Sequence, residues 1–114
     1  MKAQLLFEKN GLRTWAIVFD KGDEVKSSLT EFARRNHLMG SHFTAIGAFK
    51  DATLGYFDRE RKQYKHIPVN EQVEVVSMVG DIAAKGQEPE VHAHLVVAKS
   101  DGTAMGGHLL SAHV

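Results

Sequence analysis

The chain has 114 residues, of which 43% are hydrophobic and 25% charged, and it contains no cysteine. This composition excludes a disordered chain, and the lack of thiols excludes disulfides and thiolate-bound metal centres. The 14 basic and 14 acidic side chains give a formal net charge of zero, which argues against a protein that grips nucleic-acid phosphates by itself. The length predicts one domain over residues 1–114.

The amino-terminal stretch does not have the character of a secretion signal. Lys2 and Glu8 place charges close to the start, so no long apolar core forms there. No segment of the sequence reaches the roughly 20 apolar residues that a membrane span needs. We therefore expect a cytoplasmic protein with no membrane partner.

The first predicted element is a β-hairpin made of residues 5–7 and 12–19. The dipeptide Asn10-Gly11 between them suits a type I′ turn, because both central residues of that turn need a positive φ. Apolar side chains occur on both faces of the second strand. We therefore expect that strand to be covered on both sides.

A single helix is predicted from Glu24 to Met39. Its apolar residues fall at helical spacing on one face, acidic residues precede it, arginines close it, and Gly40 provides a terminator. The apolar face consists of Val25, Leu29, Phe32 and Ala33.

The rest of the chain predicts strands only. Runs of apolar residues, separated by charged or glycine-containing turns, mark residues 42–49, 52–57, 63–69, 71–83, 91–98 and 103–110. The expected fold class is α/β in the broad sense (α+β), with one helix and a mostly antiparallel or mixed sheet. Gly80 and Gly106-Gly107 lie inside strands and indicate bulges or close backbone packing. Asp81, beside Gly80, either reaches water or serves a site.

Seven histidines are the one anomaly of composition, and three of them suggest a metal site. His92 and His94 lie two residues apart on a predicted strand, so both imidazoles project from the same face. With His108 on the next strand, they make a three-histidine set that leaves one position open, as in catalytic zinc sites. Water, the Glu90 carboxylate or a group of a neighbouring subunit would fill that position. In the alternative, His92 and His94 are solvated and His108 is a satisfied buried histidine.

The register of the last hairpin decides whether His108 reaches the other two histidines. A two-residue turn would place His108 opposite Leu95, on the wrong face of the sheet. A three-residue loop of Ser100-Asp101-Gly102, with the glycine left-handed, would set His108 opposite His94. A bulge at Gly106-Gly107 would also restore that register.

The remaining histidines carry weaker signals. His42 and His66 are expected at the surface of strands, and His37 at the end of the helix, where a cation is favoured. His113 lies at the end of the chain and points to no site. The arginines of residues 58–62 alternate with acidic residues, which indicates a solvated turn rather than a nucleic-acid contact.

Several stretches of the second half of the chain share their order and spacing with one known family. They are Thr44–Phe49 with Ala52–Tyr56, Glu74–Ile82, Val91–Ala98, Asp101-Gly102 and Gly106–Leu110. From Gly40 to Val114 the sequence resembles the plants and prokaryotes conserved (PPC) domain, which is found beside AT-hooks in plant nuclear proteins. The hairpin and helix that precede these stretches also match.

The resemblance implies one helix packed on a strongly bent, mostly antiparallel sheet, assembled as a homotrimer. It implies a divalent metal, zinc in first place, at His92, His94 and His108, and the role of a candidate DNA-binding or regulatory protein with a DNA or transcription-related partner. The fold is also similar to that of acetolactate decarboxylase, a zinc enzyme with a His-x-His and later-His ligand set. The alternative is therefore a zinc-dependent enzyme that takes a small oxygen-rich molecule at the metal.

This sequence departs from the family pattern in three respects. It has no Arg-Gly-Arg AT-hook and no Gly-Arg-Phe-Glu-Ile-Leu motif, and both absences argue against direct DNA contact of the kind that plant members make. The family pattern continues past Val114 with one further strand. Either the protein continues beyond Val114, or the sheet lacks one strand at an edge and leaves backbone groups unpaired there.

Overall fold

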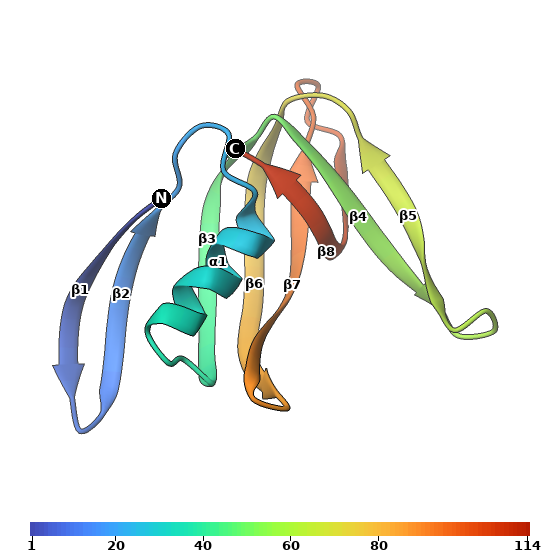
Figure 1. The fold of residues 1–114 in the computed structure, drawn as a ribbon. Coiled ribbons are helices and arrows are strands. Elements are labelled where there is room, and N and C mark those ends of the chain that lie inside the picture. Colours follow the sequence, from blue (N-terminus) through green and yellow to red (C-terminus); the bar gives the residue numbers. More distant parts are fainter.

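The computed structural model describes residues 1–114 and contains one helix and eight strands (Figure 1). The helix is α1 (Val25–Arg35), and the strands are β1 (Lys2–Lys9), β2 (Leu12–Val18), β3 (Gly40–Phe49), β4 (Asp51–Asp58), β5 (Gln63–Val69), β6 (Val73–Lys85), β7 (Glu88–Ala98) and β8 (Ala104–His113). Every strand pair is antiparallel. The one helix is too short and too polar to cross a membrane.

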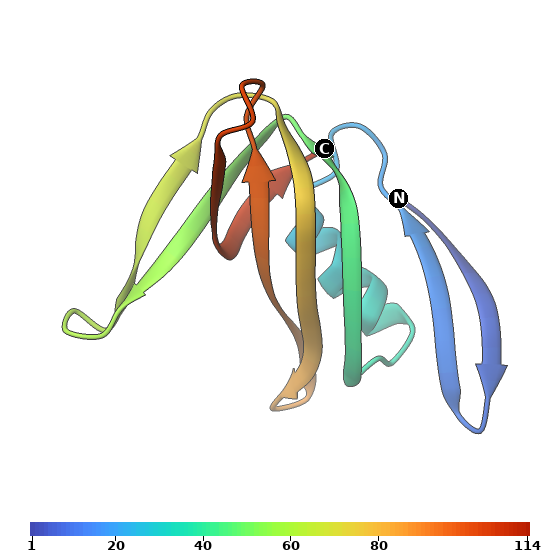
Figure 2. The same cartoon turned by 180° about the vertical axis from the view of Figure 1, so that it is seen from behind.

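The strands form two sheets that stand side by side. β1 and β2 pair only with each other, and the other six strands form one sheet in the order β3-β6-β7-β8-β4-β5. Helix α1 packs on β7 and β8, and the turned view shows the six strands from the side that α1 does not cover (Figure 2). The predicted fold class is confirmed. The prediction of a strongly bent sheet is wrong. The six strands form an open sheet that is not strongly curled, and this sheet is not hydrogen-bonded to the β1–β2 hairpin.

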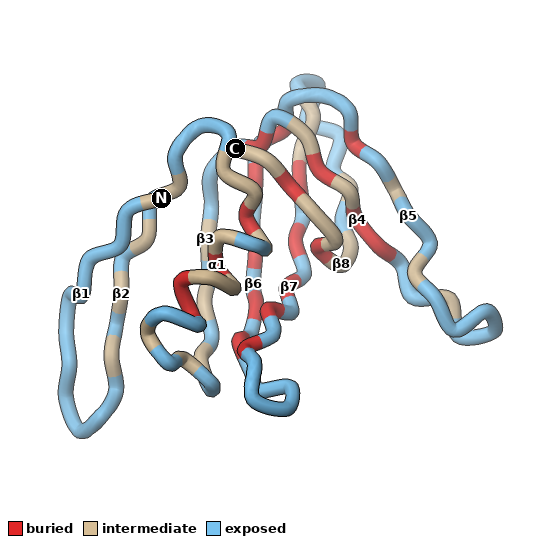
Figure 3. The backbone as a smooth tube through the Cα atoms, viewed as in Figure 1, coloured by how far each residue is buried: buried red, intermediate tan, exposed pale blue.

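The core lies between α1 and one face of the six-stranded sheet. Buried and exposed residues alternate along β6 and β7, so that one side of these strands is apolar and buried (Figure 3). The largest fully buried side chains are Leu54, Leu109, Val25, Val73, Val91 and Val97. Each contributes on the order of 1.5–3 kcal/mol by leaving water. The opposite face of the sheet remains open and carries the exposed side chains of Val76, Val79 and Val96.

The amino-terminal hairpin has the predicted turn but not the predicted burial. Asn10 and Gly11 have φ values of 53° and 81°, as a type I′ turn requires. The residues of β2 alternate between half-buried and exposed, so the expectation of cover on both sides is wrong. Only the face that carries Trp15 meets α1, where its ring packs edge-on against Phe32 at 5.2 Å.

The helix ends four residues earlier than the sequence pattern predicts. Asn36 caps it, since its Nδ2 donates a hydrogen bond to the carbonyl of Phe32 (3.0 Å). His37 then takes a φ of 55°, which turns the chain away from the helix axis. Gly40 is therefore not the terminator but the first residue of β3.

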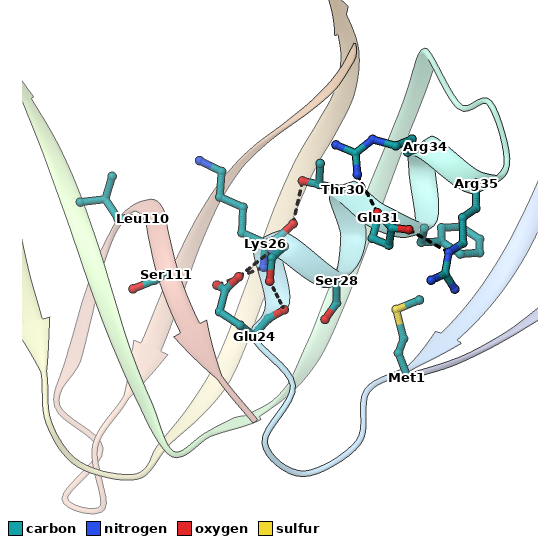
Figure 4. Close-up of a pocket in the computed structure, with 12 residues that line it drawn as sticks. Met1, Glu24, Lys26, Ser28, Thr30, Glu31, Arg34, Arg35, Leu110 and Ser111 are labelled. Atoms are coloured by element: carbon teal, nitrogen blue, oxygen red, sulfur yellow. Dashed lines mark hydrogen bonds and ion pairs between the residues drawn. The ribbon is translucent and has the colours of Figure 1, made fainter.

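Glu24 is the N-cap of α1 and also ties the helix to β8. Its carboxylate accepts hydrogen bonds from the backbone N–H groups of Lys26 (3.2 Å), Ser27 (2.6 Å) and Ala112 (3.2 Å). Figure 4 shows this side chain folded back against the first turn of the helix. Burial opposes the charged form, but the hydrogen bonds from Ser27, Ala112 and Lys26 outweigh it and lower the pKa of Glu24.

Replacing Glu24 by alanine should lower the free energy of unfolding by about 1–2 kcal/mol, because the helix loses its cap and Ala112 N–H loses its acceptor. Urea unfolding at neutral pH measures the change. The matched control is Glu31→Ala, which removes only exposed ion pairs with Arg34 and Arg35 and should leave the stability nearly unchanged. Equal losses in the two variants would show that the cap has no special role.

Candidate metal centre

The loop between β7 and β8 sets the register of the two strands that carry the histidines. Lys99 N–H donates to the carbonyl of Thr103 (2.9 Å), and Gly102 has a φ of 83°. These contacts define the three-residue loop, and His94 lies directly opposite His108. The prediction that depends on this loop is confirmed. The pairing between the strands has no shift, so the bulge considered as an alternative is not used.

His92, His94 and His108 come together on the open face of the sheet. One ring nitrogen from each lies within 4.8 Å of the other two. Nε2 of His92 and Nε2 of His94 are 3.3 Å apart. Two nitrogens bound at about 2.0–2.1 Å to one tetrahedral zinc ion lie about 3.3–3.4 Å apart. The spacing of this pair is therefore already that of two ligands of one ion.

His108 is the half-buried member of the three. Its Nδ1 is buried and has no hydrogen-bond partner. Burial, together with the nearby His92, Lys26 and His94, lowers the pKa of His108 to about 4. A histidine that binds a metal ion must have a neutral imidazole ring with one nitrogen free to coordinate the ion. Both the donor set and the unpartnered nitrogen therefore fit a divalent metal ion.

Tyr64 of β5 lies against the His108 ring. The two rings stack with centroids 4.4 Å apart and planes at 21°, and Phe57 packs edge-on against Tyr64 at 5.3 Å. Gly55 lies opposite His108 on β4, and a Cβ atom there would come within 2.9 Å of the Tyr64 ring. The contact of Tyr64 with His108 was not predicted from the sequence. A glycine inside the predicted strand 52–57 was the available signal that a ring packs over it.

The glycines inside β6 and β8 allow close backbone packing around the site, as predicted. A Cβ atom on Gly80 would lie 2.8 Å from the carbonyl oxygen of His92 and would also clash with the Phe43 ring. A Cβ atom on Gly107 would lie 2.6 Å from the carbonyl oxygen of Gly55. These glycines let the strands on either side of the three histidines approach one another.

The candidate carboxylates lie outside the cluster of the three histidines. Asp81 is exposed and lies opposite His92 on β6. Glu90 is exposed and pairs with Lys85 at 3.4 Å. The three imidazoles are thus the complete set of ligand side chains that this chain brings to one point.

The other histidines lie where the sequence indicates. His42 and His66 are exposed on β3 and β5, and His37 follows the C-cap of α1. His113 Nδ1 lies 2.8 Å from the carboxylate of Asp51, across the β4–β8 pair. None of the four joins the cluster.

The metal-free protein should lose stability as the pH falls from 6.5 toward 4. In this range the unfolded chain protonates His108 at its ordinary pKa of 6.5, while the folded chain does not. The unfolded state then binds more protons than the folded state, so the free energy of unfolding decreases as the pH decreases. The loss from this residue is on the order of 1 kcal/mol once solvent screening of the partly exposed ring is allowed for.

Urea unfolding in the presence of a chelator, at several pH values, measures this loss against His108→Leu. The variant lacks the titrating group, so its stability should fall less steeply than that of the wild type over the same range. Identical slopes in the two proteins would contradict the assignment to His108.

The sequence matches a known family over almost its whole length. Residues 6–114 match the Plants and Prokaryotes Conserved (PCC) domain. The chain belongs to this family, and the resemblance noted from the sequence is confirmed.

Solved structures of the same fold come from archaea and bacteria. A PPC protein of Pyrococcus horikoshii is 32% identical, with a TM-score of 0.82 over 84% of this chain and 67% of that chain. A metal-containing protein of Archaeoglobus fulgidus is 35% identical, with a TM-score of 0.79 over 84% and 68% of the two chains. A candidate DNA-binding protein of Ralstonia eutropha JMP134 is 37% identical, with a TM-score of 0.78 over 82% and 65%.

A curated relative is much longer than this chain. It is the bifunctional protein GlmU of Synechococcus sp. (strain JA-3-3Ab), which is 32% identical over 99 residues. The match covers 86% of this chain but only 15% of the relative. The similarity therefore concerns one part of that protein.

Proposed function

We propose that this protein binds one divalent metal ion, zinc in first place, through His92, His94 and His108, and that it acts as a regulatory PPC-domain protein. The observation that carries the proposal is the convergence of three imidazoles that the hairpin register sets on one face. The metal-containing relative from Archaeoglobus fulgidus supports it. Imidazole donors without thiolates suit zinc and other first-row metals rather than calcium or magnesium.

We propose further that the protein works as a homotrimer whose subunits meet on the open face of the sheet. Val79 lies opposite His94 on β6, and Val96 follows on β7. Both side chains are large, apolar and exposed in the single chain, at 54% and 39%. Association of copies would remove this apolar surface from water. A neighbouring subunit or a water molecule would then supply the fourth ligand.

The proposed regulatory role runs through a partner rather than through direct contact with DNA. The relative from Ralstonia eutropha is a candidate DNA-binding protein, but this chain has no net charge. The arginines of the β4–β5 turn alternate with acids, and Arg61 lies 3.9 Å from Asp58. Phosphate contacts supply most of the affinity in non-specific DNA binding, and such a surface supplies few of them.

A zinc-dependent enzyme is the second candidate, and the exposure of His92 and His94 favours it. An ion held by three histidines from this face has its open position toward solvent, where a small oxygen-rich molecule would bind. The metal would polarise a carbonyl group or activate water. Asp81, opposite His92, is the carboxylate on that face that would move a proton.

Sedimentation velocity with zinc and a fluorescent DNA duplex tests the regulatory proposal in one experiment. We expect a protein boundary at the mass of three chains, with the duplex sedimenting as free DNA even at low salt. DNA that sediments with the protein at low salt, and is released as salt rises, would contradict the partner-mediated role. A boundary at the mass of one chain would contradict the trimer.

A further inference from the structure

An edge strand of the larger sheet reaches the metal centre with one side chain. β5 lies at the edge of that sheet, and β4 separates it from β8, the strand that carries His108 (Figure 1). Tyr64 of β5 nevertheless stacks on the His108 ring, with the ring centroids 4.4 Å apart. The Tyr64 side chain therefore crosses over β4 to reach the histidine.

A missing side chain in β4 makes this crossing possible. Gly55 is buried and pairs directly with His108. A Cβ atom at Gly55 would lie 2.9 Å from Cδ1 of Tyr64, which is closer than carbon atoms pack without a shift of one of them. The Tyr64 ring thus occupies the space that a side chain at this position of β4 would fill.

The His108 ring lacks the hydrogen bond that usually orients a metal-binding histidine. Such a histidine commonly donates its second ring N–H to a carboxylate or a carbonyl group, which fixes the orientation of the ring. Nδ1 of His108 is buried without any partner, and the one close contact between ring nitrogens in the cluster joins His92 to His94. The χ2 torsion of histidine is broad, so the local backbone does not fix the ring plane either.

Stacking on Tyr64 can take the place of that hydrogen bond. The two ring planes are only 21° apart, so rotation of the imidazole about χ2 would drive its edge into the tyrosine ring. An aromatic pair contributes about 0.5–1.5 kcal/mol beyond the area that it buries. Phe57 packs edge-on against Tyr64 at 5.3 Å, so the tyrosine ring is itself held by a neighbour.

The orientation of His108 decides whether the cluster has a third donor. Its ring centroid lies 4.8 Å from that of His92 and 5.6 Å from that of His94. A half-turn about χ2 exchanges each ring nitrogen with a ring carbon, so a freely turning ring offers the ion a nitrogen for only part of the time. A ring that is already held in one orientation loses less freedom when the ion binds, and the affinity is higher for that reason.

We propose that Tyr64 is a positioning residue of the metal centre, whose ring, stacked on His108 over Gly55, holds the imidazole in the orientation that coordinates the ion. The proposal rests on the metal-binding function proposed above and adds to it a residue outside the ligand set. It also links the edge of the sheet to the metal. Because the stack favours metal binding, metal binding favours the stack by the same factor.

Zinc titration calorimetry of two Tyr64 variants measures the contribution of the ring. Tyr64→Leu should bind zinc roughly tenfold more weakly than the wild type, the lower end of the range for outer residues of metal sites. Tyr64→Phe keeps the flat ring and should restore the affinity to within about threefold of the wild type. The matched control is Tyr56→Leu, which replaces a tyrosine of β4 that is 67% exposed and should leave zinc affinity unchanged.

A double-mutant cycle tests whether Tyr64 acts through His108. In a His108→Ala background, Tyr64→Leu should leave the residual zinc affinity unchanged, because the ring that it positions is gone. An equal loss of affinity in both backgrounds would show that Tyr64 only supports the fold of the β4–β5 hairpin, and would overturn the proposal.

Proton NMR in the presence of a chelator tests the stack without any metal. The ring current of Tyr64 should shift the ring protons of His108 upfield in the wild type and in Tyr64→Phe, and Tyr64→Leu should lose this shift. A wild type without the shift would overturn the proposal. If the wild type and Tyr64→Leu bound zinc equally well, this proposal alone would fail. A wild type that shows the shift but binds no zinc would contradict the proposed function, and this proposal with it.

Discussion

Replacing His92 and His94 together by alanine will abolish the thermal stabilisation that zinc gives to the wild-type protein. A ligand that binds only the folded state stabilises it by about 4 kcal/mol when its concentration is a thousand times its dissociation constant. The double variant keeps only His108, and one imidazole does not hold the ion. Both replaced side chains lie on the open face of β7, so the core is untouched. Scanning calorimetry with zinc and with a chelator measures the effect.

The matched control replaces His42 and His66 by alanine. These two histidines are also exposed on strands, but they lie outside the cluster of His92, His94 and His108. This control should gain as much stability from zinc as the wild type does. If zinc stabilised the His92→Ala, His94→Ala variant to the same extent, the metal would bind somewhere else and the proposed centre would be wrong.

Gly107→Ala will lower the free energy of unfolding by about 2–3 kcal/mol, the upper part of the range for an added methyl group in a packed site. The new Cβ atom would lie 2.6 Å from the carbonyl oxygen of Gly55. That oxygen belongs to the backbone of β4, so it can move away only if the β4–β8 pairing shifts. His108 is the next residue and pairs with Gly55, so zinc affinity should also fall at least tenfold.

Gly40→Ala is the control for Gly107→Ala. Gly40 begins β3, has no left-handed φ, and a Cβ atom there meets nothing within 4 Å. Its replacement should change the stability by less than about 0.5 kcal/mol. Urea unfolding of the two variants, with a zinc titration of each, separates backbone crowding from a general effect of glycine replacement. Equal losses of stability would contradict the crowding.

The local part of the site was predictable as one of three alternatives, because Asp101-Gly102 suits a two-residue turn as well as the end of a three-residue loop. Gly102 supplies the left-handed residue that a three-residue loop needs, and this loop alone sets His94 opposite His108. The contact of Tyr64 with His108 was not predictable in the same way. It depends on the pairing of β4 with both β5 and β8, and alternation of apolar residues identifies strands without naming their neighbours.

Two of the three errors in the fold have clear physical causes. The helix was expected to reach Met39, because Gly40 is a strong terminator, but Asn36 provides a side-chain cap first. β2 was expected to be covered on both faces because both faces carry apolar side chains. A sequence pattern shows which surfaces favour burial, but it does not show whether the same chain supplies the cover.

X-ray absorption spectroscopy of the zinc-loaded protein tests the metal centre most directly. The account predicts about three imidazole nitrogens at about 2.0–2.1 Å from the zinc ion and one further light-atom ligand. It also predicts one ion per chain, with the imidazole signal lost in the His92→Ala, His94→Ala variant. A first shell made of oxygen ligands only, or an unchanged spectrum in the variant, would contradict it.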